Sequence, residues 1–347
     1  MAKKKINSGY VTQTFDRESR ILKYFPGDYK YFFEMPLFGT GDFANESNYI
    51  SDPDMEQQID NFLASKKNLL TILIGYKGMG KSTILKNHLK VHASDQLTYT
   101  NNAIIFSKFK WDYPSFEVNL SCFEHILQTL TTRLCMQCHI NWRNEAKAFY
   151  DFLIEKEPCL FSIDFHYEEI LNEFSKNNPK LFEVRRLQFL LQTKKISQFT
   201  LIFDNVEDLN KNTRYLLITQ LIECFQLLTE DSSQLSIVKV LFSFRPATLY
   251  AAQQYECFKN KEIDHYLLLK NTINLEKYFH LKLKNYNKEN GNYEIWNKCL
   301  PLFMKVSQKY NRKYDLIIKK LCNYSVPDSM KIYSNIFSNS RWMHDIT

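Results

Sequence analysis

The apolar positions of the chain fall into two patterns, short continuous runs and longer stretches with helical spacing. Continuous runs cover residues 69–74, 103–106, 200–203 and 237–244, and a shorter one covers 266–269. Runs of this length that are rich in Ile, Leu, Val and Phe are typical of strands buried on both faces of a sheet. The chain therefore predicts four buried strands, with the shorter run as a candidate fifth.

The stretches between these runs have the spacing of amphipathic helices. Asp52-Pro53 is a helix-cap pair, and Met55, Ile59 and Phe62 then fall on one helical face. Helical patterns are expected in four further segments, 81–93, 113–196, 212–228 and 271–347. Strands that alternate with helices in this way predict an α/β fold, in which a mostly parallel sheet is flanked by helices.

The length and composition set the class of protein. At 347 residues, of which 44% are hydrophobic, the chain suits two or three domains, or one large domain with a satellite. No stretch of about 18 or more apolar residues is present, so no membrane span is expected. The basic residues 1–5 run into polar residues without the apolar segment of a secretory signal. We therefore expect a cytoplasmic protein without a membrane partner.

The eight cysteines form no recognisable disulfide framework, but three residues spell the pattern C-x-x-C-H, at Cys135, Cys138 and His139. This pattern attaches haem in c-type proteins. Such attachment belongs to exported proteins, whereas this chain offers no export signal, and a zinc site would need a second ligand pair. We therefore expect no metal or redox role for this pair.

The formal net charge is +7, and it is distributed unevenly along the chain. From Tyr255 to the C-terminus there are 16 Lys and Arg against 9 Asp and Glu, so the last quarter carries the whole excess. A basic module of this kind could meet nucleic acid or another acidic surface. A set of solvated helix faces is the alternative, and we give it the greater weight.

A glycine-rich motif follows directly on the first apolar run. Its residues have the spacing G-x-x-x-x-G-K-S and are followed by Thr83: Gly75, Tyr76, Lys77, Gly78, Met79, Gly80, Lys81 and Ser82. Strand, loop and helix in this order are the context of the P-loop (Walker A), whose backbone amides cradle phosphate oxygens. In that motif Lys81 would reach the β- and γ-phosphates, and the Ser82 hydroxyl would bind Mg²⁺. The sequence therefore predicts a triphosphate and Mg²⁺ as ligands of residues 75–83.

Two later runs end in residues that suit the same site. The third run ends in Asp204, with Glu207 and Asp208 three and four positions on, and the fourth ends in Arg245. Ligands of parallel sheets bind at the carboxyl ends of the strands. An aspartate there is well placed to hold the magnesium shell. The arginine is suited to sensing the γ-phosphate, and a surface position before a turn is an equal alternative for it.

The order of these parts resembles the STAND/NACHT and AAA+ branches of the P-loop ATPases, which carry a P-loop, a Walker B strand, a sensor strand and a helical lid. Residues 204–208, D-N-V-E-D, are similar to the NACHT-type D-G-L-D-E signature, and residues 243–246, S-F-R-P, are similar to the T-S-R-P sensor. The resemblance implies that Asp204 binds Mg²⁺ and that Glu207 or Asp208 polarises the attacking water. It implies Arg245 as the sensor.

The same resemblance implies a division of the chain into three parts. Residues 1–50 would form an N-terminal extension, residues 51–270 a P-loop ATPase core with a helical insertion at about 113–196, and residues 271–347 a basic helical lid domain. The insertion separates Lys81 from Asp204 by more residues than these families usually have. In the lid, Lys331 is a weak substitute for a second sensor arginine.

The function that the resemblance implies is an ATP-binding and slowly ATP-hydrolysing switch, which controls a homo-oligomer or a separate effector protein in bacterial signalling or antiviral defence. The alternative is a DNA-directed AAA+-type ATPase that binds nucleic acid through the basic C-terminal module. A nucleotide-binding scaffold without turnover is a third class. GTP is disfavoured, because no N-K-x-D motif follows an apolar strand.

Overall fold

The computed structural model of the chain describes residues 49–90, 96–100, 102–111, 121–158, 166–230, 236–259 and 265–269, with isolated positions at 263 and between 278 and 332. The chain divides into two compact units. One comprises Met1–Asp52, Tyr76–Asn87 and Lys270–Thr347, and the other comprises Pro53–Gly75 and His88–Leu269. Most of the predicted N-terminal extension and most of the predicted lid lie outside the described residues.

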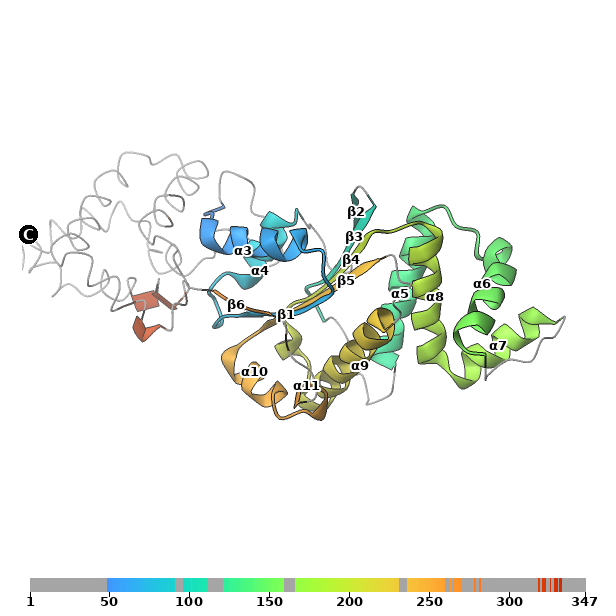
Figure 1. Cartoon of the computed structure of the whole chain (residues 1–347). Coiled ribbons are helices and arrows are strands. Elements are labelled where there is room, and N and C mark those ends of the chain that lie inside the picture. Colours follow the sequence, from blue (N-terminus) through green and yellow to red (C-terminus); the bar gives the residue numbers. More distant parts are fainter. Residues whose placement is uncertain are drawn as a thin grey trace, which may run out of the picture. The chain divides into compact units, whose positions relative to one another are not determined.

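Figure 1 shows the helices and strands of the described chain. In order they are α3 (Pro53–Ala64), β1 (Leu69–Ile74), α4 (Lys81–His88), β2 (Gln96–Thr100), β3 (Ala103–Lys108), α5 (Ser121–Gln137), α6 (Trp142–Lys156), α7 (Tyr167–Asn177), α8 (Pro179–Thr193), β4 (Gln198–Phe203), the 3-10 turn η1 (Val206–Asp208), α9 (Lys211–Thr229), β5 (Ile237–Phe244), α10 (Pro246–Ala252), α11 (Glu256–Lys259) and β6 (His265–Leu268). All five predicted strands are present, whereas β2 was not predicted.

Six strands form one sheet in the order β2-β3-β4-β5-β1-β6. All neighbours are parallel except β2 and β3, which are antiparallel. The sheet therefore confirms the predicted α/β class. After β1 the chain goes to the β2 edge, returns through β4 and β5, and then crosses to β6 on the other side of β1. This reversal makes the carboxyl end of β1 a topological switch point, the place where open α/β sheets bind ligands.

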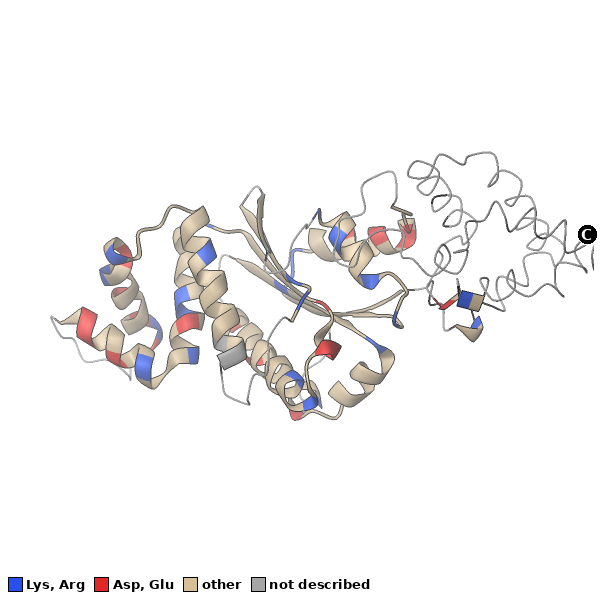
Figure 2. Ribbon diagram, turned by 180° about the vertical axis from the view of Figure 1, so that it is seen from behind, with Lys and Arg blue, Asp and Glu red and all other residues tan. Residues whose placement is uncertain are grey.

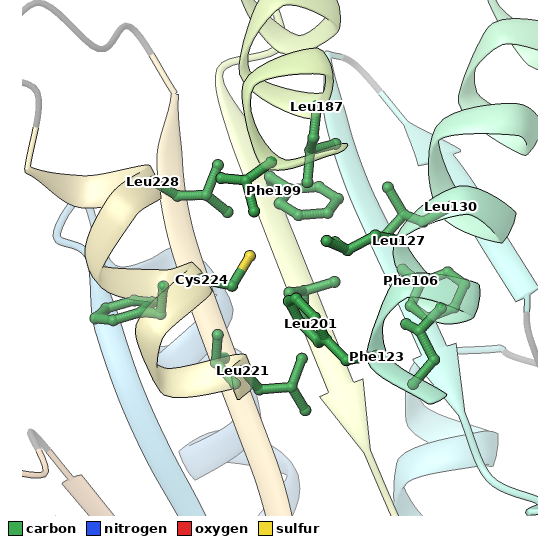
Figure 3. Packing of buried hydrophobic residues seen from close by; sticks show 14 of the residues in the cluster. Phe106, Phe123, Leu127, Leu130, Leu187, Phe199, Leu201, Leu221, Cys224 and Leu228 are labelled. Atoms are coloured by element: carbon green, nitrogen blue, oxygen red, sulfur yellow. The ribbon is translucent and has the colours of Figure 1, made fainter. Parts of the chain in front are cut away.

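One face of the sheet, called the apolar face here, carries the main hydrophobic core. The strand register places Phe106, Leu201 and Val240 side by side on this face. Helices α5, α8 and α9 cover it, and Figure 3 shows their buried side chains packed against the strands. The residues that these helices contribute include Phe123, Leu127, Leu130, Leu187, Leu221, Cys224 and Leu228. Burial of this apolar surface is what fixes the helices to the strands.

The opposite face, called the polar face here, is buried as well but alternates apolar residues with polar ones. Thr71, Ser107, Thr200, Lys239 and Ser243 all point to this face and have no exposed surface. Buried polar side chains cost free energy unless they are hydrogen-bonded. These side chains come from four strands, so the polar face contains several buried polar groups that need hydrogen-bond partners.

Lys239 shows how one of these groups is satisfied. Its ammonium donates to the Leu63 carbonyl at 2.5 Å and lies 5.9 Å from the centroid of the Phe62 ring. Leu63 belongs to the last turn of α3, whose carbonyls have no partner within the helix. Lys239 therefore caps α3 and fixes the helix that leads into β1.

The four helices between β3 and β4 form an ordered extension of the same unit. Helices α5 and α8 lie side by side, and α6 and α7 pack against α8 (Figure 1). The Thr131 hydroxyl on α5 donates to the buried Glu183 carboxylate on α8 at 3.0 Å. The Arg186 guanidinium on α8 lies 4.2 Å from the centroid of the Trp142 ring on α6. These polar contacts hold the helices in register with one another in addition to their apolar packing.

We expect the substitution Lys239→Met to change how stability depends on pH. Burial lowers the pKa of Lys239 from 10.5 to about 8, so in that interval the unfolded chain binds more protons than the folded chain. The free energy of unfolding of the wild type should therefore rise between these pH values, by at most about 1.4 kcal/mol per pH unit for one proton. Below that range the cost of the buried charge is fully present. Urea denaturation at several pH values measures the slope.

The Lys239→Met variant should lack this rise, because methionine carries no proton. Lys147→Met, at an exposed position on α6, is the matched control and should keep the slope of the wild type. Equal slopes in the wild type and in Lys239→Met would show that the buried lysine does not titrate in this range.

Candidate functional site

Residues 75–82, called the glycine loop below, follow β1 without a break. Gly75 ends the strand, and its amide donates to the Phe244 carbonyl of β5 at 3.1 Å. Gly78 and Gly80 have φ values of 78° and 93°. A side chain at either position would be strained, whereas glycine adopts these angles readily. Turns of this kind direct successive backbone amides into a concave nest, which is an anion-binding geometry.

The helix α4 begins at Lys81, directly behind the glycine loop. The Ile84 amide donates to the Gly80 carbonyl at 2.9 Å, which is the first helical hydrogen bond, so the preceding amides lack helical acceptors. Lys81 is buried, and its ammonium reaches back across the loop to the Tyr76 carbonyl at 3.3 Å. In the glycine loop Met79 is buried, Tyr76 and Lys77 are exposed, and Ser82 is half-buried, as is Thr83 directly after it. The loop and helix together have the features of a phosphate-binding helix start.

Asp204 follows the last residue of β4 and is fully buried. Phe203 is level with Phe242 of β5, and Phe244 is level with Ile74 of β1. Asp204 is therefore level with Ser243 of β5 and Leu73 of β1. It lies at the edge of the sheet where β1, β4 and β5 all end. One strand, β5, lies between β4 and β1. This spacing puts Asp204 about 10 Å to the side of β1, because neighbouring strands are about 4.8 Å apart.

The turn after β4 is bonded to the segment that follows β3. The Asp204 amide donates to the Lys108 carbonyl at 2.9 Å, which continues the sheet ladder by one residue. The Trp111 indole donates to the Asp204 carbonyl at 2.7 Å, and the Asn205 amide group donates to the Phe109 carbonyl at 3.1 Å. Asn205 has a φ of 55°, in the left-handed region that asparagine tolerates better than most residues. The carboxyl end of β4 is thus held by residues from a neighbouring strand.

Glu207 and Asp208, which the sequence could not tell apart as candidate bases, differ in their surroundings in the structure. Glu207 is half-buried, and its Oε1 accepts the backbone N–H of Arg245 at 2.6 Å, across the ends of β4 and β5. Asp208 is exposed to solvent. The Arg214 guanidinium of α9 donates to the carbonyls of Glu207 and Leu209, at 3.2 and 2.8 Å, and so fixes the backbone of the turn.

Arg245 occupies the N-cap position of α10 without a side-chain capping hydrogen bond, and it is half-buried. Its backbone amide is bound by Glu207. Within the described part of the chain its guanidinium has no hydrogen-bond or ion-pair partner. Of the predicted site residues, the structure thus brings Asp204, Glu207 and Arg245 to one edge of the sheet, and it leaves Asp208 in solvent. Residues 76–83 belong to the other compact unit.

Sequence reasoning missed three residues at this edge, Trp111, Asn205 and Ser243. Ser243 is level with Asp204, is fully buried, and its hydroxyl has no hydrogen-bond partner among the described residues. A single hydroxyl inside an apolar strand is a signal that the sequence did contain. The partner of Trp111 could not be read from the sequence, because it lies 93 positions away.

The C-x-x-C-H pattern forms the end of α5. The His139 amide donates to the Met136 carbonyl at 3.2 Å and the Ile140 amide to the Cys135 carbonyl at 2.8 Å, with His139 in the left-handed region. This is the Schellman arrangement that ends many helices. Burial raises the pKa of the Cys135 and Cys138 thiols, which disfavours the reactive thiolate. The described geometry gives the motif a structural role as a helix cap.

Among the described residues, no group of three or more His, Cys, Asp or Glu is arranged to hold a metal ion. A cation at Asp204 would therefore take its other ligands from hydroxyl, water and phosphate oxygens, which is how Mg²⁺ is usually bound beside a nucleotide. Within its own unit, Asp204 is the buried carboxylate at this edge of the sheet that could bind such an ion.

Acidic and basic residues are interspersed along the described helices (Figure 2). The basic excess of residues 255–347 lies largely outside the described part of the chain. Lys331, which is described, is exposed and lies 3.7 Å from Asp328. None of the described helices is both long enough and apolar enough to cross a membrane. No protein-family model matches this chain, and no curated protein matches it either.

Proposed function

We propose that this chain is an ATP-binding and ATP-hydrolysing switch of the STAND/AAA+ type. The observation that carries the proposal is the glycine loop, in which the motif G-x-x-x-x-G-K-S follows an interior strand at a topological switch point. The residues fit a triphosphate, since Gly78 and Gly80 adopt positive φ angles that open the loop to phosphate oxygens. ATP is preferred over GTP on the sequence grounds given above.

Each residue of the site has a role in the proposed reaction. Backbone amides of the glycine loop and of the first turn of α4 bind the phosphates, and Lys81 neutralises charge on the β- and γ-phosphates. The Ser82 hydroxyl and the Asp204 carboxylate are the proposed ligands of Mg²⁺, which would supply positive charge to the phosphates. Arg245 senses the γ-phosphate from the end of the strand next to β1.

Glu207 is the proposed base that orients the attacking water. Its carboxylate is half-buried and held at the ends of β4 and β5, whereas Asp208 points to solvent. A general base must be positioned within hydrogen-bond reach of the water that it activates. A carboxylate that is fixed by the backbone of Arg245 meets this requirement better than one on an exposed turn. The same bond links the proposed base to the backbone of the proposed sensor.

We expect Lys81→Ala to weaken ATP binding by about 10- to 100-fold, because a hydrogen bond from a charged donor is lost at the phosphates. Isothermal titration or a fluorescent ATP analogue measures the affinity. Lys77→Ala is the matched control, since Lys77 is a lysine of the same loop whose side chain is exposed. Equal losses in the two variants would show that the loop contributes only general positive charge. Wild-type affinity in Lys81→Ala would rule out the proposed site.

Replacing the proposed base should stop hydrolysis without preventing binding. We expect Glu207→Gln to lower kcat by about 10²- to 10⁴-fold, the usual contribution of a general base. Asp208→Asn should stay close to the wild type, because Asp208 lies in solvent. Phosphate release under saturating ATP, with ATP affinity measured in parallel, gives both quantities. A Glu207→Gln variant that hydrolyses ATP as fast as the wild type would exclude Glu207 as the base.

A DNA-directed ATPase is the second candidate, favoured by the 16 Lys and Arg against 9 Asp and Glu from Tyr255 onward. The two candidates differ in what ATP changes. For the switch we expect the size of the wild-type particle to change with ATP and that of Lys81→Ala to stay constant, as measured by light scattering. For the DNA-directed enzyme, duplex DNA should bind in a salt-sensitive manner and stimulate hydrolysis. Stimulation by DNA with no change in size would replace the switch by the second candidate.

A further inference from the structure

Trp111 is placed against the proposed metal site by three contacts. Its indole N–H donates to the Asp204 carbonyl at 2.7 Å. Its ring stacks on Phe203, with centroids 6.4 Å apart and planes at 26°. The Lys108 ammonium lies 5.3 Å from the centroid of the same ring. The side chain is 9% exposed, so these contacts are made in the interior of the unit. Phe203, Asp204 and Lys108 are all at the carboxyl ends of β3 and β4.

The carbonyl that Trp111 binds lies at the point where the chain leaves the sheet. The Asp204 amide still bonds to β3, but the next residue, Asn205, turns into the left-handed region. The peptide between Asp204 and Asn205 therefore fixes the main chain from which the Asp204 side chain extends. A buried carbonyl needs a hydrogen-bond partner, and the indole supplies it. The Asn205 side chain adds a second bond to the same segment, at the Phe109 carbonyl.

We propose that Trp111 is a positioning residue for the metal-binding carboxylate of Asp204. The proposal rests on the proposed function, in which Asp204 holds the Mg²⁺ of ATP. The indole locks the Asp204–Asn205 peptide, so the carboxylate is held in the direction that receives the ion before the ion binds. Preorganisation of this kind raises affinity because less ordering remains to be done on binding. Trp111 itself touches neither metal nor nucleotide.

The test uses the full chain and measures how ATP binding depends on Mg²⁺. Trp111→Phe keeps an aromatic ring that can stack on Phe203 but removes the N–H donor. We expect the Mg²⁺ concentration for half-maximal binding of fluorescent ATP to rise about two- to tenfold, which is the contribution of one hydrogen bond. Binding of the same ATP analogue in EDTA should be unchanged, since the glycine loop is intact.

Two further variants keep the test decisive. Asn205→Gly preserves the left-handed turn and removes the bond to Phe109, so it should shift the Mg²⁺ midpoint in the same direction even if Trp111→Phe folds poorly. Trp142→Phe, in the helical insertion, is the matched control and should leave the Mg²⁺ midpoint as in the wild type. Thermal melts of all variants separate a loss of stability from a loss of positioning.

The outcomes distinguish the two proposals. If wild-type binding depends on Mg²⁺ and Lys81 but Trp111→Phe and Asn205→Gly have the wild-type midpoint, the positioning role is overturned and the proposed function stands. An equal loss of affinity with and without Mg²⁺ in Trp111→Phe also overturns it, because it shows a general structural defect. If the wild type binds no ATP, or binds it without regard to Mg²⁺, the proposed metal site fails and this inference fails with it.

Discussion

The parallel pairing of β5 with both β4 and β1 is the constraint on which the rest of the structure depends. Its register brings the ends of β1, β4 and β5 to one edge, within two residues of the same level. The Gly75 amide and the Glu207 carboxylate both bond to the end of β5, at Phe244 and Arg245. A slip of one residue in either ladder would turn the polar side chains of β5 into the apolar core. Core packing and site geometry are therefore fixed by the same hydrogen bonds.

The two faces of the sheet differ in the kind of side chains that they bury. The apolar face is closed by α5, α8 and α9, and its burial supplies the hydrophobic driving force. The polar face carries Lys239, which anchors α3, and Ser243, which lies level with Asp204. Polar groups in a buried sheet lower its stability unless something compensates them. The cost of burying the Lys239 ammonium is offset by its hydrogen bond to the last turn of α3. The Ser243 hydroxyl lies at the edge of the sheet where the proposed ligand would bind.

The proposed site is held mainly by backbone hydrogen bonds. Asp204 is held through its amide and carbonyl, and Glu207 is held through its own carbonyl and through the amide of Arg245. Backbone groups of the sheet move little, so carboxylates attached to them are preorganised. The contacts reach in three directions, to β3 and the residues directly after it, to α9, and to the start of α10. A switch of the proposed type needs such connections, because a nucleotide can bias only those elements that its site touches differently in two states.

The sequence by itself determined the strands of the central sheet and the order of the chemical motifs along them. Continuous apolar runs and the glycine spacing are local patterns, so β1, β4 and β5 and the residues at their ends could be predicted. The strand β2 was missed, because an edge strand such as Q-L-T-Y-T contains no apolar run. Only the tertiary structure decided that β5 lies between β4 and β1, that Glu207 rather than Asp208 is held at the edge, and that Trp111 binds Asp204. These facts depend on contacts between residues far apart in the chain, and such contacts leave no periodic trace in the sequence.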